Sequence, residues 1–137
     1  MKTVAQLLGE KGREVISVRP TDSVMAALSV MSQKNVGALV VMDGDRLAGI
    51  FSERDYARKM ILYGSGSTNT KVSDLMTAEV VTASPGDTLD QCMAIMTERR
   101  FRHMPVVQDG KVIGVISTTD LIRETISAQD INAELMR

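Results

Sequence analysis

The amino-acid sequence predicts an α+β fold built from two similar halves, each with the element order β-α-β-β-α. Two observations lead to this prediction. Residues 49–55 read Gly-Ile-Phe-Ser-Glu-Arg-Asp, and 65 positions later residues 114–120 read Gly-Val-Ile-Ser-Thr-Thr-Asp. Around both segments, apolar residues at helical spacing alternate with short apolar runs of strand length. The offset of 65 needs no gap over residues 15–59, which indicates internal duplication.

In the first half, apolar spacing and turn residues set the order of the elements. A short helix over residues 3–9, ended by Gly9, precedes a strand over 14–18. The next helix has its cap at Thr21 or Asp22, ends near Asn35, and buries residues at helical spacing, namely Val24, Ala27, Leu28 and Met31. Strands over 36–42 and 47–51 form a hairpin through the turn at 43–45, and a helix over 53–62 follows.

The second half repeats this order after a linker rich in glycine and serine at residues 64–71. A short helix at 72–76 and a strand at 80–83 lead to a helix with the apolar residues Leu89, Cys92, Met93 and Met96. A hairpin over 104–107 and 111–116 leads to a helix from residue 118 that carries Leu121, Ile122, Ile126 and Ile131. We therefore expect a first repeat with its N-terminal helix (1–63), the linker (64–71) and a second repeat with its C-terminal helix (72–137).

Neither half is large enough to be stable alone, because a domain of about 60 residues buries only a small core. We expect the two halves to pack sheet to sheet about a pseudo-twofold axis. Such packing places the two equivalent strand-to-helix corners on related sides of a shared cleft.

Composition and charge exclude several classes of function. The chain has 137 residues, a net charge of −1 and a pI of about 5.8, which argues against nucleic acid or an anionic membrane as the main partner. No apolar stretch approaches the length of about 20 residues that a membrane span needs, and the N-terminus lacks a signal-peptide core. A single cysteine excludes an intrachain disulfide and fits a reducing cytoplasm.

The two strand-to-helix corners offer chemistry suited to a nucleotide. The start of a helix presents free N–H groups and partial positive charge, which favour phosphate. Ser52 and Ser117 supply hydroxyls, while Asp55 and Asp120 can each accept two hydrogen bonds, as the paired hydroxyls of a ribose require. The alternative is purely structural, because Ser-x-x-Asp also resembles a capping box, although that motif prefers Glu or Gln at its last position.

Further repeated residues surround these corners. The first half contains Val18-x-Pro20-x-Asp22-Ser23, a helix with Met31, and Leu39-Val40-Val41 before its corner. The second half contains Pro85-x-Asp87-Thr88 and then Arg102-His103-x-Pro105-Val106-Val107. This order of motifs resembles a tandem pair of cystathionine β-synthase (CBS) domains, called a Bateman module, and the resemblance covers nearly the whole chain.

The resemblance implies regulatory binding of an adenosine-containing molecule, with AMP as the first expectation and ADP, ATP, S-adenosylmethionine or NAD(H) as alternatives. It implies that Asp55 and Asp120 hold the ribose, with Ser52 and Ser117 near the ribose or phosphate. It implies that adenine lies against backbone segments, which here are Ser17, Val18, Gly37, Ala38 and Leu39 in the first half and Val81, Thr82, His103, Met104 and Pro105 in the second.

The two halves differ in charge, so we expect their sites to be inequivalent. Arg54 stands in the first corner where the second has Thr119. The second half has Arg99, Arg100, Arg102 and His103 where the first has Lys34, Asn35, Gly37 and Ala38. Guanidinium groups such as those of Arg54 and Arg102 suit phosphates. Alternatively, Arg99 and Arg100 simply end a helix, where positive charge is favourable.

No catalytic machinery is expected. One cysteine and one histidine are too few for the usual zinc site, and Cys92 lies on the apolar face of an expected helix. We expect a stand-alone regulatory protein that senses energy or redox state, forms a homodimer and signals to a protein effector in another chain. The first alternative is a structural dimerisation module without bound nucleotide, and the second is an enzyme that acts on a nucleotide.

Overall fold

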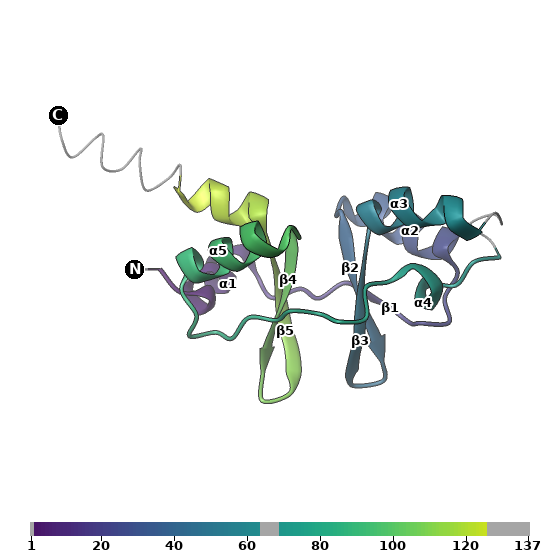
Figure 1. The fold of residues 1–137 in the computed structure, drawn as a ribbon. Helices are drawn as coiled ribbons and strands as arrows, with labels where there is room; N and C mark the ends of the chain where they lie inside the picture. The colour runs from purple at the N-terminus through teal and green to yellow at the C-terminus, as the bar shows by residue number, and fades with distance from the viewer. Residues whose placement is uncertain (1, 64–68, 126–137) are drawn as a thin grey trace. The chain divides into compact units, whose positions relative to one another are not determined.

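The computed structural model describes residues 2–63 and 69–125, which form two compact units (Figure 1). The first unit comprises residues 15–80, and the second comprises residues 1–14 together with the chain from residue 81. This grouping differs from the linear division expected at residues 63 and 72. The N-terminal helix packs with the strands of the second repeat, not with those of the repeat that follows it directly in the sequence.

The first unit contains a three-stranded sheet with its helices. Strand β1 (Ser17–Val18) pairs in parallel with β2 (Ala38–Asp43), which pairs antiparallel with β3 (Arg46–Ser52). Helix α2 (Val24–Lys34) connects β1 to β2, and α3 (Glu53–Tyr63) follows β3 directly. The short helix α4 (Val72–Leu75) completes this unit, and of the linker expected at 64–71 only the last three residues are described.

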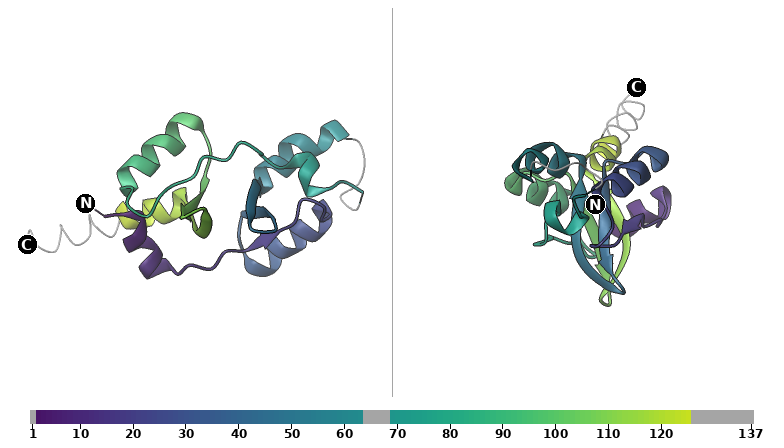
Figure 2. Two further views of the ribbon diagram at one scale, coloured as in Figure 1. Left: turned by 90° about the horizontal axis from the view of Figure 1, so that it is seen from below. Right: turned by 90° about the vertical axis from the view of Figure 1, so that its right-hand side faces the viewer.

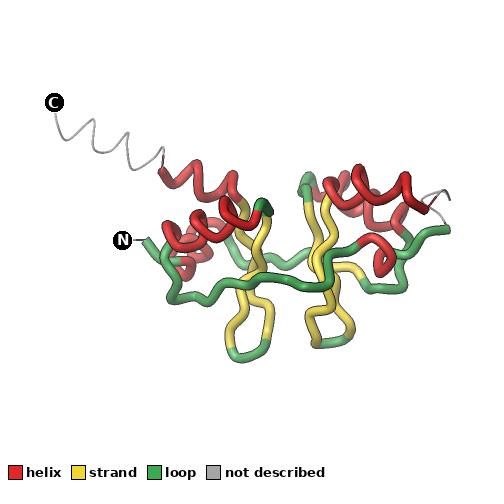
Figure 3. Tube along the Cα trace, in the orientation of Figure 1, coloured by secondary structure: helices red, strands yellow, loops and turns green. Residues whose placement is uncertain are grey.

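The second unit repeats the hairpin-to-helix order, as the tube of Figure 3 shows. It contains α1 (Val4–Lys11), α5 (Leu89–Arg99), and the antiparallel strands β4 (His103–Gln108) and β5 (Lys111–Ser117). A helix begins at residue 118 and is described to residue 125, so the expected apolar positions Ile126 and Ile131 lie outside the described residues. Mixed helices and strands in two small sheets confirm the predicted α+β class.

The predicted strand at 80–83 is reduced to a single parallel bridge between Ala83 and Val106. Both residues are buried, and they occupy the positions equivalent to Val18 and Val41 in the first unit. Its two hydrogen bonds join Ala83 N–H to the Pro105 carbonyl at 2.9 Å and Val107 N–H to the Ala83 carbonyl at 2.8 Å. The pairing is thus of the same kind in both units, and only its length differs.

Each short helix is held by main-chain hydrogen bonds to a Pro-x-Asp loop. Helix α1 donates from Val4 N–H to the Asp87 carbonyl and from Ala5 N–H to the Pro85 carbonyl, both at 2.9 Å. Helix α4 makes the equivalent bonds, from Val72 N–H to Asp22 at 2.8 Å and from Ser73 N–H to Pro20 at 3.0 Å. The repeated Pro-x-Asp motif is therefore the docking loop for a short helix.

The Asp22 side chain has a different role from the predicted one. Its carboxylate accepts the Arg19 N–H at 2.8 Å and so closes the docking loop, and Asp87 accepts the Ser84 N–H at the same distance. The cap of α2 is Ser23, whose Oγ accepts the Ala26 N–H at 3.0 Å. The prediction of Thr21 or Asp22 as the cap was wrong because Asp22 is already engaged in the turn that precedes the helix.

Helix α1 also ends later than predicted. It continues through Gly9 to Lys11, and Gly12, with a φ of 103°, terminates it by donating its N–H to the Leu8 carbonyl at 2.8 Å. A glycine tolerates such a positive φ at a helix end, whereas Gly9 lies inside the helix. The extra residues place Lys11 beside the second corner, as described below.

The core of each unit includes the apolar face of its short helix. In the second unit, Val4, Leu7 and Leu8 of α1 pack with buried residues of α5 and the hairpin, and Figure 2 shows α1 in purple beside these elements. In the first unit, Val72 and Leu75 of α4 are fully buried with residues of α2, β2 and β3. Among the described helices, none combines the length and the apolar composition that a membrane span requires.

The short helices approach the glycine that opens each repeated segment. A Cβ placed on Gly49 would lie 2.8 Å from Met76 Sδ and 2.8 Å from the Thr77 carbonyl oxygen. A Cβ on Gly114 would lie 2.8 Å from Leu8 Cδ2, the end of a flexible side chain. The glycine repeats because a short helix lies against that strand in each unit.

This difference predicts unequal costs for the same substitution. Gly49→Ala should destabilise the protein by about 1–3 kcal/mol, because the backbone carbonyl cannot move aside easily. Gly114→Ala should cost less, because Leu8 can change rotamer. Urea unfolding of both variants tests this, with Gly9→Ala as the steric control, since apart from its chain neighbours and its own helix backbone no atom lies within 4 Å of its added Cβ. A larger loss for Gly114→Ala would contradict the assignment.

Candidate functional site

The first corner is formed where β3 ends at Ser52 and α3 begins at Glu53. Ser52 pairs with Ala38 at the start of β2, and the Glu53 N–H donates to the Gly37 carbonyl at 3.0 Å. The structure therefore brings together Gly37, Ala38 and Ser52, which are three of the predicted site residues.

Ser52 and Asp55 bind each other through main chain and side chain. The Ser52 N–H donates to Asp55 Oδ2 at 2.9 Å, and the Asp55 N–H donates to Ser52 Oγ at 3.1 Å. The Ser52 hydroxyl also donates to Oδ2 at 3.0 Å. This reciprocal pattern is a capping box, and it fixes the orientation of the carboxylate at the helix start.

The second corner has the same internal geometry. The Ser117 N–H donates to Asp120 Oδ2 at 2.9 Å, and the Asp120 N–H donates to Ser117 Oγ at 3.2 Å. The capping interpretation of Ser-x-x-Asp is thus confirmed in both repeats, and an aspartate reaches back where Glu or Gln is more usual.

The outer partners of the two aspartates differ. Asp55 Oδ1 accepts the Thr77 hydroxyl at 3.1 Å and lies 3.4 Å from Lys59 Nζ, one turn along α3. Thr77 follows α4, so the short helix of the unit delivers this hydroxyl. The Lys59 ammonium also donates to the Leu75 carbonyl at 3.1 Å and so connects α3 to α4.

In the second corner a lysine from α1 takes the outer position. Lys11 Nζ lies 2.5 Å from Asp120 Oδ2 and donates to the Val115 carbonyl at 2.6 Å. Partial burial by itself would raise the pKa of Asp120, but the hydrogen bonds from Lys11 and the Ser117 N–H outweigh it and lower that pKa. The carboxylate is therefore held in its charged form.

His103 and Arg102 lie next to this corner. His103 is the register partner of Ser117, and the Thr118 N–H donates to the Arg102 carbonyl at 2.9 Å. Burial lowers the pKa of His103, and the positive charges of Lys11 and Arg102 lower it further, against the opposing effect of Asp120. The imidazole is therefore neutral at pH 7.

The remaining predicted site residues differ in how far their side chains are buried. Val18, Leu39, Met104 and Pro105 have buried side chains, so their backbone is what they offer to a ligand. Ser17 and Thr82 are exposed, while Val81 and Arg54 are partly buried, with Val81 packed against the core of its unit. Arg99 is the last residue of α5 and Arg100 is its left-handed C-cap, as the helix-end alternative proposed.

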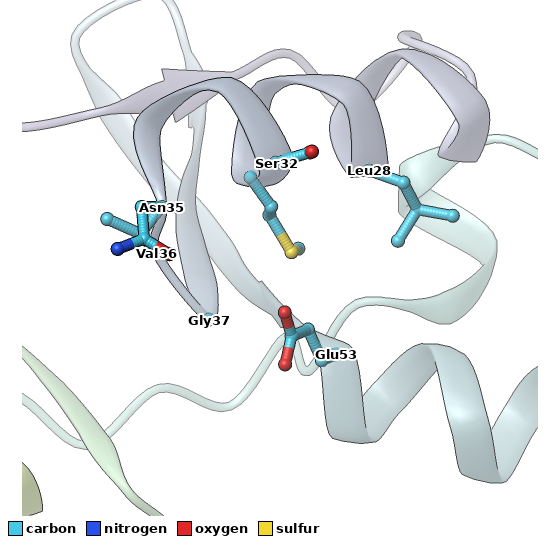
Figure 4. Close-up of a pocket in the computed structure, with 7 residues that line it drawn as sticks. Leu28, Ser32, Asn35, Val36, Gly37 and Glu53 are labelled. Atoms are coloured by element: carbon cyan, nitrogen blue, oxygen red, sulfur yellow. The ribbon is translucent and has the colours of Figure 1, made fainter.

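A pocket of about 460 Å³ lies at the end of α2 (Figure 4). Leu28 and Ser32 line it from α2, Gly37 lines it from the loop to β2, and Glu53 faces it from α3. Met31, Asn35 and Val36 complete its lining. Gly37 is shared with the predicted site, whereas Ser52 and Asp55 do not line this pocket.

Sequence reasoning missed the outer partners Lys11, Thr77 and Lys59. The contact of Lys59 with Asp55 could have been predicted from the sequence, because Lys59 stands four residues after Asp55 on one helix and opposite charges at that spacing lie close together. Gly12 was not predicted as the end of α1, although a glycine there is also a signal for a helix end and leaves Lys11 in the last turn. For Thr77 the pattern gives no signal, since its contact depends on the docking of α4.

Cys92 is a core residue, as the sequence predicted. It is buried on α5, and burial followed by the nearby charge of Asp87 raises its pKa to about 11. Its thiol is therefore protonated at neutral pH. Within residues 2–63 and 69–125, no group of three or more metal-binding side chains occurs.

Comparison with known proteins identifies the family of both repeats. The sequence matches the CBS domain over residues 11–62 and again over 72–127. It is 38% identical over 133 residues to the mitochondrial CBS domain-containing protein CBSX3 of Arabidopsis thaliana, covering 90% of this chain and 65% of CBSX3. It is 33% identical to inosine-5'-monophosphate dehydrogenase of Nitrosopumilus maritimus, but it spans only 26% of that enzyme.

Solved structures show the same fold. The CBS domain protein NE2398 superposes with a TM-score of 0.89 and 45% identity, covering 91% of this chain and 98% of that one. The CBS domain pair of protein MJ0100, crystallised with 5'-methylthioadenosine and S-adenosyl-L-methionine, has a TM-score of 0.83 at 22% identity and covers 93% and 98% of the two chains.

The environment of His103 predicts its titration. Because its folded pKa is lowered, the neutral form contributes stability above the unfolded pKa of about 6.5, and this is lost as the pH falls through the folded pKa. NMR of this single histidine should give a pKa below 6.5, and Lys11→Gln should raise it. Lys111→Gln at the hairpin turn is the charge control. A pKa at or above 6.5 would refute this electrostatic description.

The burial of Cys92 predicts slow reaction with thiol reagents. At about pH 8 the native thiol should be modified at least about a hundredfold more slowly than in urea. Its raised pKa leaves little thiolate, and its burial keeps the reagent away from the sulfur. A colorimetric thiol assay with and without urea measures both rates. Equal rates would mean that Cys92 is exposed and reactive in the folded protein.

Proposed function

The chain belongs to the CBS domain family, and on that premise we propose that it is a regulatory protein that binds an adenosine-containing ligand at its two Ser-x-x-Asp corners. AMP is the first candidate, and ADP, ATP and NADH are the alternatives. Binding changes the surface offered to a protein effector and so reports energy or redox state. We further propose that the protein works as a homodimer, since two-chain closure is the commonest symmetric assembly.

One observation carries this proposal. Each unit holds an aspartate at the start of a helix, with its carboxylate oriented by the N–H of the serine three residues earlier. The side chains of Asp55 and Asp120 are 13% and 15% exposed, so each carboxylate is largely shielded but accessible. A carboxylate fixed before binding loses little conformational freedom when it accepts two hydroxyls.

The chain segments beside the corners suit an adenine base. The backbone at Gly37–Leu39 and at His103–Pro105 begins the strand that pairs with each corner. Backbone N–H and carbonyl groups can bind the edge of a base, and the neighbouring apolar residues can pack on its face. Ser17, Val18, Val81 and Thr82 are proposed as the opposite side of the same adenine sites. The complexes of MJ0100 with two adenosine derivatives support this ligand class.

The proposal also covers the assembly of the protein and whether it catalyses a reaction. A CBS-CP12 protein from cyanobacteria is hexameric, and its likeness to this chain, at 22% identity, is one of fold. We propose a smaller assembly, the homodimer. We propose no catalytic role, because the thiol of Cys92 is buried and protonated at neutral pH and so is not an activated nucleophile.

The alternative function is a structural dimerisation module without bound nucleotide. It is favoured by the capping bonds of Asp55 and Asp120, which give both residues a stabilising role that needs no ligand. The two functions differ in whether an adenosine-containing molecule raises the stability of the folded protein.

Calorimetric titration of the ligand-free protein with AMP, ADP, ATP, S-adenosylmethionine and NADH tests the proposal. We expect saturable binding and a higher melting temperature, since a ligand at a hundred times its Kd stabilises the folded state by about 2.7 kcal/mol. Asp55→Asn or Asp120→Asn should weaken binding at its own corner by about tenfold or more, because a charge-assisted hydrogen bond is lost.

Asparagine retains an oxygen for the capping N–H, so these variants should remain folded. The matched control is Asp87→Asn, which makes the same change at a carboxylate that accepts an N–H in a docking loop. If both corner variants bound all five ligands as tightly as the unaltered protein does, the assignment of the binding site to the corners would be refuted. Absence of any binding by folded protein would favour the dimerisation module.

A further inference from the structure

We propose that Lys11 makes the second corner selective for ligands that carry a phosphate next to the ribose. This inference rests on the proposed function of that corner, and it concerns a residue of α1, outside the repeated corner segment. Lys11 acts here as a specificity-determining residue.

The contacts of Lys11 define what a ligand must replace. Its Nζ lies 2.5 Å from Asp120 Oδ2 and 2.6 Å from the Val115 carbonyl oxygen. Oδ2 also accepts the Ser117 N–H, so among the described contacts this one oxygen carries both the cap and the ion pair. A ribose diol that donates to both carboxylate oxygens therefore competes with the ammonium for Oδ2.

The displaced ammonium then needs a new partner. The Lys11 side chain is 34% exposed, so it is partly screened from water and can swing outward from the last turn of α1. A nucleoside provides hydroxyls for Asp120 but no anion for Lys11. A nucleotide provides both, because its phosphate follows the ribose and can accept the ammonium.

The surroundings strengthen this preference for an anion. Arg102 and Lys11 both act on His103 as positive charges, and His103 is the register partner of Ser117 in the second corner. The charged groups that act on His103 are Lys11, Arg102 and Asp120, of which one is negative. Occupation of Asp120 by a diol leaves Lys11 and Arg102 available to a phosphate.

The first corner lacks this arrangement. Its carboxylate has the neutral Thr77 hydroxyl at 3.1 Å and a more distant ammonium, Lys59, at 3.4 Å on the same helix. A ribose can replace the Thr77 hydroxyl without leaving a charge unpaired. A preference for phosphate that depends on a displaced lysine of a short helix should therefore be a property of the second corner.

The experiment compares AMP with adenosine in the full chain. Asp55→Asn weakens the first corner, so the tighter of the two binding events that calorimetry detects in this background gives the Kd of each ligand for the second corner. The ratio of the adenosine Kd to the AMP Kd should fall by about tenfold in Lys11→Gln, because one charge-assisted hydrogen bond to phosphate is lost. The fall in this ratio should come from weaker binding of AMP, while adenosine should bind as tightly as before or more tightly.

Two further variants separate charge from structure. Lys11→Arg should retain the ratio, since a guanidinium also pairs with phosphate. Lys111→Gln removes one positive charge from the same unit at the opposite end of the β4–β5 hairpin and should also retain it. Melting temperatures and circular dichroism of all variants verify that they are folded.

Each result has a definite meaning. An unchanged ratio in Lys11→Gln, with AMP still bound, overturns the role of Lys11 and leaves the proposed function standing. Equal gains for AMP and adenosine overturn it as well, because Lys11 would then only compete with ribose. If neither ligand binds to the Asp55→Asn protein or to the unaltered chain, this inference fails; the proposed function fails with it only if ADP, ATP, S-adenosylmethionine and NADH do not bind to the unaltered chain either.

Discussion

The hydrogen bonds between a Pro-x-Asp loop and a short helix are the interaction on which both units depend. They attach α1 to the second repeat and α4 to the first, at positions that match bond for bond. The attached helices then bury Val4, Leu7 and Leu8 in one core and Val72 and Leu75 in the other. Without them each hairpin would expose the face that carries Gly49 or Gly114, and neither small core would be complete.

The same docking determines the chemistry of the corners. Thr77, two residues after the end of α4, donates to Asp55, and Lys11, the last residue of α1, pairs with Asp120. Both contacts arise because the short helix and the residues that follow it pack against the strand that ends in the corner. Capping and ligand binding are therefore not competing interpretations. The bonds that stabilise the first turn of the helix also hold the carboxylate in one orientation, and an oriented carboxylate is what a ribose site requires.

Much of this fold could be predicted from the sequence, because its signals are local. Continuous apolar runs identified both hairpins, and the turns with Gly44 and Gly110 have the positive φ that such glycines permit. Helical spacing identified α2 and α5, including the core position of Cys92. The Ser-x-x-Asp segments were found because they occur twice, and repetition separates a pattern from chance.

The errors and omissions have a common physical cause, which is tertiary context. Glycine commonly ends a helix, which made Gly9 the predicted end of α1. The buried contacts of Leu7 and Leu8 instead accompany a helix that continues to Lys11, before Gly12. The expected strand before α5 is one bridge long although β2 and β4 have the same length of 6 residues, so the apolar residues themselves do not set the length of the pairing. Lys11 and Thr77 reach the corners through the packing of a short helix onto a distant part of the sequence.

These constraints indicate where the two sites are free to differ. Ser and Asp of each corner are needed for the start of a helix, and the opening glycine is needed for the approach of a short helix. A change at any of these positions costs stability whatever ligand is bound. Lys11 and Thr77 belong to neither helix start, so they can differ between the two halves while both caps are retained. Ligand preference is therefore expected to reside in residues outside the repeated motif, where the two halves of this chain in fact differ.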